Sequence, residues 1–133
     1  MVLSHILYRS SGRLDQFKQD CEDILVSARR QNQEYRLSGF LHAEDGIFVQ
    51  WLEGPAEALD FVAGKILADP RHRDIAILAK GEIAERQFPR WSMGFSTGES
   101  APLFEYLAEQ DINTHDKRAY ASGIHRFLLE RVA

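Results

Sequence analysis

The segment from Gly46 to Pro55, which reads Gly-Ile-Phe-Val-Gln-Trp-Leu-Glu-Gly-Pro, constrains the fold more than any other part of the chain. Its bulky apolar residues lie between a glycine and a Gly-Pro pair, which is typical of a β-strand over residues 48–52. Side chains alternate along a strand, so one face carries Phe48, Gln50 and Leu52, and the other carries Ile47, Val49 and Trp51. Because both faces are mostly apolar, we predict a central strand that is covered on both sides.

Gln50 is the polar residue in the middle of this strand. A buried amide without a hydrogen-bond partner costs about 1–3 kcal/mol, so something must bond to it. The sequence leaves two kinds of partner open. One is nearby protein, as for an ordinary core glutamine, and the other is a heteroatom of a bound ligand.

Length, charge and cysteine content restrict the class of protein. The chain of 133 residues is long enough for one domain with a real core. Its net charge of −4 predicts no general attraction to nucleic acid or to an anionic membrane. No apolar run approaches the roughly 20 residues of a membrane helix, and the N-terminus lacks the pattern of a signal peptide. We expect a cytoplasmic protein in which the single cysteine, Cys21, is buried and inert.

Hydrophobic periodicity and turn residues predict the order of the elements. Strands are expected at residues 2–8, 37–42, 48–52, 75–78 with an extension toward 83, and 93–96. A first helix is expected at 14–30, after a turn at 10–12 and before a stop at 31–33. A second helix begins at Pro55 and ends before Asp69-Pro70, with an inward stripe of Leu59, Val62, Ile66 and Leu67.

This order predicts an α+β fold, a ferredoxin-like βαββαββ sheet with two helices on one face. The other face, with Trp51, would then be bare, and an open apolar face of that size favours association. The tail, residues 98–133, is expected to form C-terminal helices near 103–107 and 120–128, the second capped by Asn113 or Thr114. Either this helical extension folds back on the sheet or a second copy packs there, as in a homodimer.

Most catalytic chemistry finds no support in the sequence. The five histidines are scattered without ligand spacing, so no metal site is expected. The serines lack a nucleophile elbow, and the glycines form no phosphate loop. Glu53 has no partner carboxylate, so we expect it to close the strand or to accept a hydrogen bond from a loop. We therefore expect no enzyme.

What remains is a set of polar and aromatic residues at the ends of elements. Taken singly, each could serve only the structure, as a strand-end aromatic, a helix stop, a solvated face or a core side chain. The set comprises Tyr8, Asn32, Gln50, Lys65, Asp69, Arg71, His72, Trp91 and Met93.

Taken together, these residues lie in motifs that are similar to those of one family. The motifs are the strand ending in Tyr8, Ala28-Arg-Arg-Gln-Asn32, Leu37-Ser-Gly-Phe-Leu41, Gly46-x-Phe48-x-Gln50-x-Leu52-Glu-Gly54-Pro55, Asp69-x-Arg71-His72 and Arg86-x-Phe88-x-x-Trp91-Ser-Met93. Over about residues 1–97 the chain resembles a BLUF domain, the flavin-binding fold of blue-light sensors. It departs from the family pattern at Ala28, Gln31, Arg36 and Trp51, none of which belongs to the Tyr8–Asn32–Gln50 trio.

The resemblance implies a flavin ring between the two helices, held edge-on to the sheet. Ile24 and Ile66 would sandwich the ring, and Leu41 and Phe48 would line its edge. Asn32 would bind the pyrimidine edge, because an amide can both donate and accept. Further polar contacts would come from Asp69, Arg71 and His72, and looser ones, near O2 or the phosphates, from Arg30, Gln31 and Lys65. The cofactor is expected to be FAD, with FMN as the alternative.

The resemblance also implies a photochemical mechanism. Light would drive an electron and a proton from Tyr8 through Gln50, and Gln50 would rotate or tautomerise, so that the flavin absorption moves to the red. The change would pass through Met93 and Trp91, of which either could face the flavin, to the tail or to a partner protein in trans. A flavin-free ferredoxin-like interaction module is the alternative function. The Tyr8–Asn32–Gln50 trio weighs against it, because a bare scaffold has no need of these residues.

Overall fold

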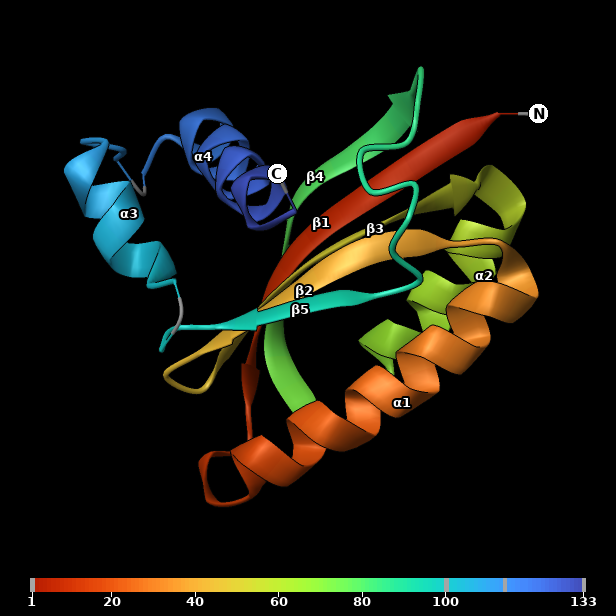
Figure 1. Cartoon of the computed structure of the whole chain (residues 1–133), viewed down its shortest axis with the longest axis horizontal. Coiled ribbons are helices and arrows are strands. Elements are labelled where there is room, and N and C mark those ends of the chain that lie inside the picture. Colours follow the sequence, from red (N-terminus) through yellow and green to blue (C-terminus); the bar gives the residue numbers. More distant parts are fainter. Residues whose placement is uncertain (1, 100, 114, 133) are drawn as a thin grey trace.

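The protein has a mixed five-stranded β-sheet with helices on both faces (Figure 1). It is seen in a computed structural model that describes residues 2–99, 101–113 and 115–132. The strand order is β4-β1-β3-β2-β5, and β5 runs parallel to β2. The elements are β1 (Leu3–Gly12), α1 (Phe17–Tyr35), β2 (Ser38–Glu44), β3 (Ile47–Pro55), α2 (Ala56–Leu67), β4 (His72–Ile83), β5 (Gly94–Thr97), α3 (Leu103–Glu109) and α4 (Lys117–Arg131), with a 3-10 turn at Leu14–Gln16. The predicted ferredoxin-like arrangement with added C-terminal helices is confirmed.

The strand β3 is central and buried on both faces, as its sequence predicts. It pairs with β1 on one side and with β2 on the other, so Gln50 lies between Tyr8 and Leu41. Phe48 and Leu52 belong to the apolar cluster under α1 and α2. Val49 and Trp51 belong to a second cluster that includes residues of α3 and α4.

The end of α1 differs from the prediction. The helix does not stop at residues 31–33 but continues to Tyr35. Glutamine and asparagine are tolerated inside a helix, and Asn32 is turned inward and buried. The helix ends at Arg36, which has φ of 60° in the left-handed region, and its N–H donates to the carbonyl of Asn32.

The predicted turn at 10–12 is wrong, because these residues continue β1. Ser10 and Ser11 pair with β3, while Ser11 and Gly12 pair with β4, which begins at His72 rather than at 75. Ladder hydrogen bonds on both sides of β1 outweigh the turn preference of a Ser-Ser-Gly sequence. Leu67, which was predicted to face inward, is 40% exposed in the last turn of α2.

The second face of the sheet is covered by α4, so of the two covers that the sequence left open, the tail and a second copy, the structure shows the tail. Trp51 is only 3% exposed. Its indole ring stacks between two imidazoles, with centroid distances of 4.4 Å to His5 and 4.2 Å to His125. Its Nε1–H donates to Glu53, 2.9 Å away. Since His125 belongs to α4, this stack anchors the C-terminal helix to β1 and β3.

The cap of α4 is not the predicted one. The Asp116 side chain accepts a hydrogen bond from the backbone N–H of Ala119 and begins the helix. Asn113 instead accepts from the N–H of His115 within the preceding turn. Thr114, the other predicted cap, lies outside the described residues.

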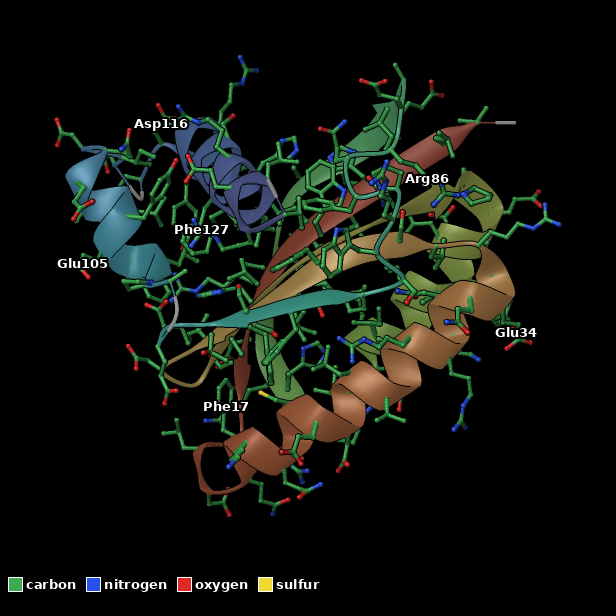
Figure 2. The ribbon with its side chains drawn as sticks, viewed as in Figure 1. Phe17, Glu34, Arg86, Glu105, Asp116 and Phe127 are labelled. Atoms are coloured by element: carbon green, nitrogen blue, oxygen red, sulfur yellow. The ribbon has the colours of Figure 1, made fainter. Side chains whose placement is uncertain are left out.

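Removing the Phe127 side chain should test how far the stability of the domain depends on α4. Phe127 extends from α4 (Figure 2) and is 1% exposed. Its ring contacts those of His42 and Tyr106. Phe127→Ala should lower the free energy of unfolding by about 3–5 kcal/mol in urea titrations, because it leaves a cavity between α4 and the sheet. Leu14→Ala, at a side chain that is 78% exposed, should change it by less than about 0.5 kcal/mol. Equal values for the two variants would contradict this packing.

The stability of the fold should decrease in mild acid because of one buried histidine, His42, and one half-buried histidine, His125. Burial lowers the pKa of His42 and that of His125, and the neighbouring His5 lowers the latter further. The unfolded chain therefore takes up protons near pH 6.5 while the folded chain does not, so stability falls as the pH falls below about 6.5. Melting temperatures between about pH 8 and about pH 5 should show this decline, and His125→Gln should reduce it. His115→Gln, at an exposed position, is the control and should leave the decline unchanged. A decline that is the same in His42→Gln and His125→Gln as in the wild type would contradict the assignment.

Candidate functional site

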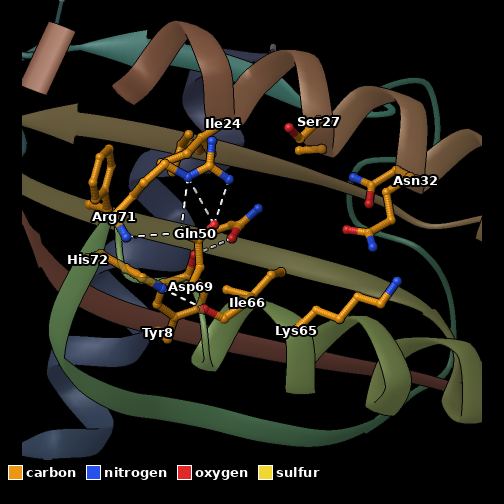
Figure 3. Close-up of a pocket in the computed structure, with 14 residues that line it drawn as sticks. Tyr8, Ile24, Ser27, Asn32, Gln50, Lys65, Ile66, Asp69, Arg71 and His72 are labelled. Carbon is orange, nitrogen blue, oxygen red and sulfur yellow. Dashed lines mark hydrogen bonds and ion pairs between the residues drawn. The ribbon is translucent and has the colours of Figure 1, made fainter. Parts of the chain in front are cut away.

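A cavity of about 240 Å³ lies between α1 and α2 and opens over the central strands (Figure 3). The helix α1 supplies one wall and α2 the opposite wall, while β1, β2 and β3 supply the floor. The lining residues are Tyr8, Ile24, Ser27, Ala28, Gln31, Asn32, Leu41, Phe48, Gln50, Lys65, Ile66, Asp69, Arg71 and His72. Every predicted binding residue except Arg30 therefore lines one cavity. Arg30 lies on the exposed side of α1.

The hydroxyl of Tyr8 and the amide of Gln50 meet at the floor of the cavity. The two residues are direct partners across β1 and β3, and both are buried. The Tyr8 hydroxyl donates to Oε1 of Gln50, and Nε2 of Gln50 donates to the sulfur of Met93 at 3.5 Å. The partners of the buried amide are thus two side chains, and the thioether is a weak acceptor. The amide therefore keeps donor capacity for a stronger partner in the cavity.

Burial keeps the Tyr8 hydroxyl protonated. It raises the pKa of Tyr8 well above its ordinary value, and the negative charge of Asp69 raises it further. Tyr8 is therefore a hydrogen-bond donor to Gln50 at any ordinary pH.

Met93 and Trp91 lie in different environments. Met93 is 2% exposed and packs in the cluster under α1 and α2, where its sulfur contacts Gln50. Trp91 is 42% exposed, does not line the cavity, and its ring contacts Phe40. Met93 is therefore the one beside Gln50, although neither Met93 nor Trp91 lines the cavity.

The C-terminal half of α1 is tied to the segment before β5. Nδ2 of Asn32 donates to the carbonyl of Ser92, and Nε of Arg29 donates to the carbonyl of Met93 at 3.1 Å. In the described part of the chain, Oδ1 of Asn32 accepts no hydrogen bond, and Asn32 lines the cavity. One amide thus holds the segment before β5 and keeps an acceptor for a ligand.

An ion pair and a fixed histidine close the other end of the cavity. Arg71 binds both carboxylate oxygens of Asp69, at 2.6–3.0 Å, and this bonding lowers the pKa of Asp69 and raises the pKa of Arg71. His72 contacts the carbonyl of Ile66 through Nε2 at 2.6 Å and the hydroxyl of Ser10 through Nδ1 at 2.7 Å. Because a carbonyl only accepts, the proton lies on Nε2 and Nδ1 accepts from Ser10.

Sequence reasoning missed two serines in or near this site. Ser27 lines the cavity one helical turn after Ile24, a spacing from which it could have been found. Ser10 orients His72 and has the same strand parity as Tyr8, but the Ser-Ser-Gly sequence around it is typical of a turn.

Comparisons with known proteins identify the family. The family model described as "Sensors of blue-light using FAD", BLUF, matches residues 3–94. This chain belongs to the BLUF family. The match includes the Tyr8–Gln50 pair and both helices that flank the cavity, and ends at Gly94, the first residue of β5. The BLUF domain is a sensor domain rather than an enzyme.

Relatives and solved structures agree with this assignment. The photoactivated adenylate cyclase subunit beta of Euglena longa is 31% identical over 122 residues, which cover 91% of this chain and 14% of that protein. The dark-state structure of the BLUF protein BlrB has a TM-score of 0.81 at 29% identity and covers 98% of this chain and 97% of that one. The ground-state structure of BlsA has a TM-score of 0.82 at 28% identity and covers 96% and 87%.

The match covers only a small part of the Euglena longa relative, so the similarity does not extend to the functions of that whole protein. The chain spans about a seventh of the length of the Euglena longa relative, so the cyclase activity in that name is said of that protein alone. No helix in the described ranges is both long enough and apolar enough to cross a membrane.

The ion pair at the end of the cavity can be tested without any ligand. Arg71→Gln should raise the pKa of Asp69 toward its ordinary range, because the bidentate hydrogen bonds to Arg71 are what lower it. Carboxyl carbon chemical shifts measured against pH will report this value. Arg73→Gln is a matched control, since Arg73 is exposed and faces Asp74. A pKa of Asp69 that moves equally in both variants would argue against the pair.

Proposed function

We propose that this BLUF domain binds FAD in the cavity between α1 and α2 and signals blue light through Tyr8 and Gln50. One observation carries the proposal. The Tyr8 hydroxyl and the Gln50 amide, which both line the cavity, form a buried hydrogen-bonded row with the Met93 sulfur, which lies outside the lining. A row of donors and acceptors in which the amide can exchange its oxygen and nitrogen suits a switch. A protein that used this fold only as an interaction module would have no need of such a row.

The lining of the cavity suits a flat ring with polar edges. Ile24 on α1 and Ile66 on α2 supply apolar contacts from opposite walls (Figure 3). Asn32 offers the acceptor and donor of its amide to the pyrimidine edge, while Asp69, Arg71 and His72 supply polar groups at the other end. A volume of about 240 Å³ is below the roughly 300–1,000 Å³ of most ligand pockets, so it suits the ring alone.

The remainder of the cofactor is expected to extend past Gln31 and Lys65 toward solvent. The amine of Lys65 lies over the ring of Phe61 at 4.6 Å and makes no ion pair among the described residues, so it is available to a phosphate. The description of the family supports FAD over FMN. Arg30 does not line the cavity, so it is not among the proposed contacts with the cofactor.

Bound flavin supplies the absorption of blue light and an acceptor for one electron. The protein supplies the rest. The raised pKa of Tyr8 keeps its proton in place until the phenol loses an electron, after which the proton can pass to Oε1 of Gln50. Both the electron and the proton would then return to Tyr8, so that the orientation of the Gln50 amide is the lasting change. An amide that rotates exchanges its oxygen and nitrogen, so Nε2 would then face Tyr8 and Oε1 would face Met93. A thioether has no proton to donate, so the rotated amide loses its bond to Met93.

Loss of that bond gives a route for the signal. Met93 directly precedes β5, and its carbonyl is bound by Arg29 of α1. We infer that the state of Gln50 is transmitted to this segment and then to a partner protein in trans.

The sequence suggested a homodimer that forms through the sheet face carrying Trp51. Because Trp51 is buried under α4, a homodimer would need another surface. A buried, unpaired Cys21 is consistent with a reducing compartment, so we place the receptor in the cytoplasm. The family match does not favour the flavin-free interaction module.

An absorption spectrum in the dark and under blue light tests the proposal directly. The wild-type protein should carry flavin, and its bands should move slightly to the red and recover in the dark. Tyr8→Phe should keep the flavin and abolish the shift, because the phenol can no longer donate a proton to Gln50. Tyr35→Phe, a tyrosine of α1 that does not line the cavity, should behave like the wild type. A colourless protein that refuses both added FAD and added FMN would refute the proposal.

A further inference from the structure

A second hollow lies beside α1 and shares no lining residue with the flavin cavity. It has a volume of about 690 Å³ and is lined by residues of the first half of α1, of the β2–β3 hairpin and of the segment from β5 to α3. These three segments lie at the same end of the molecule (Figure 1). Its apolar lining comes from all three parts of the chain. These residues are Phe17, Cys21, Leu25, Ala43, Phe95 and Pro102. We refer to this hollow as the α1–β5 groove.

The rim of the groove is acidic. The carboxylates of Glu22, Asp45 and Glu99 are exposed and form no hydrogen bond or ion pair with the described residues. The remaining carboxylate, that of Glu44, is already bound to Nε2 of His42 and to the N–H of Leu103. Lys18 supplies the one basic side chain among the lining residues. The rim therefore offers three free negative charges around an apolar floor.

The apolar surface continues beyond the groove. Phe17, Lys18 and Glu22 also line a shallow hollow of about 510 Å³ that includes Asp15 and Leu14. Leu14 is 78% exposed. Together the two hollows are lined by residues from Leu14 to Leu25, so they follow the 3-10 turn and the first half of α1.

We propose that the α1–β5 groove binds an amphipathic helix of a partner protein whose apolar stripe is flanked by lysine and arginine. An apolar floor alone would accept any apolar segment, but three free carboxylates at its rim select basic residues. An acidic segment would meet like charge. A second copy of this chain is disfavoured for the same reason, because each copy carries a net charge of −4.

The groove is connected to the light-sensing residues by β5. Phe95 of the groove lies two residues after Met93 and pairs with Leu41, which lines the flavin cavity. A change in the Gln50–Met93 contact therefore reaches the floor of the groove along one strand. Docking itself needs no flavin, while a difference in affinity between the dark and lit states rests on the proposed function.

The test uses the full chain and a fluorescent helical peptide of about 18 residues, built of leucine and lysine in an amphipathic repeat. A peptide with glutamate in place of lysine is the charge control. Fluorescence anisotropy should show binding of the lysine peptide and none of the glutamate peptide. The double variant Glu22→Lys, Glu99→Lys should weaken binding roughly tenfold or more, because it replaces attraction by repulsion at the rim.

A matched double variant separates the groove from the general acidity of the protein. Glu34→Lys, Glu57→Lys changes the net charge equally at exposed acids of α1 and α2 that do not line the groove. It should alter the affinity by less than about twofold if the long-range charge is screened. Equal weakening in the two double variants would overturn the proposal.

Cys21 supplies an independent readout of the position of the peptide. It is the only cysteine of the chain and lies in the floor of the groove, and burial raises its pKa to about 11, so alkylation is slow. The bound lysine peptide should slow the alkylation of Cys21 further, and an unchanged rate would place the peptide elsewhere.

Absorption spectra of the same samples distinguish the proposed photochemistry from the proposed docking. A protein without a red shift that still binds the peptide refutes the photochemistry alone, and equal dark and lit affinities in a protein with an intact red shift refute the coupling.

Discussion

The buried amide of Gln50 is the constraint on which the arrangement of this domain depends. It lies in the middle of β3 between the apolar residues Val49 and Trp51, and it would cost about 1–3 kcal/mol if it were left unpaired. Its two partners come from different parts of the chain, Tyr8 from β1 and Met93 from the residue before β5. The strand order therefore does more than bury apolar surface. It brings together one row of polar atoms that no local segment could assemble, and the cavity opens directly above that row.

The same strand joins this cavity to the opposite face of the sheet. Trp51 follows Gln50 and points to the other side, where His5 and His125 stack on its two faces. The Glu53 carboxylate is fully buried and accepts hydrogen bonds from Trp51, from Ser38 and from the backbone N–H groups of Gln87 and Phe88. Glu53 thus serves a loop, as its sequence context predicted. The C-terminal helix is held by contacts with β3 itself, so the two faces of the sheet are not independent layers.

Local pattern was sufficient wherever local physics decides the structure. The alternation in β3, the helical period of α1 and α2 and the motif residues around the cavity were all predictable from the sequence. The sequence pattern gave the wrong structure where pairing between distant segments decides it. Ser10 to Gly12 has the composition of a turn, but both neighbouring strands extend far enough to pair with it. The sequence did not decide whether the tail or a second copy covers Trp51, because no short-range signal shows which surface the tail will cover. Arg30 fell within a matching motif, yet its position on α1 points it away from the cavity.

The helix α1 is the element that can relate the two hollows of this domain. Successive faces of the helix serve different neighbours: Ile24, Ala28 and Gln31 line the flavin cavity, and Cys21 and Leu25 line the α1–β5 groove. Asn32 and Arg29 hold the carbonyls of Ser92 and Met93, just before β5. A rearrangement at Gln50 that releases Met93 therefore acts at the point where α1 and β5 are fastened to each other. Because both elements line the groove, we propose that a small shift between them would change its width, so that the groove would respond to the state of Gln50, which does not line it.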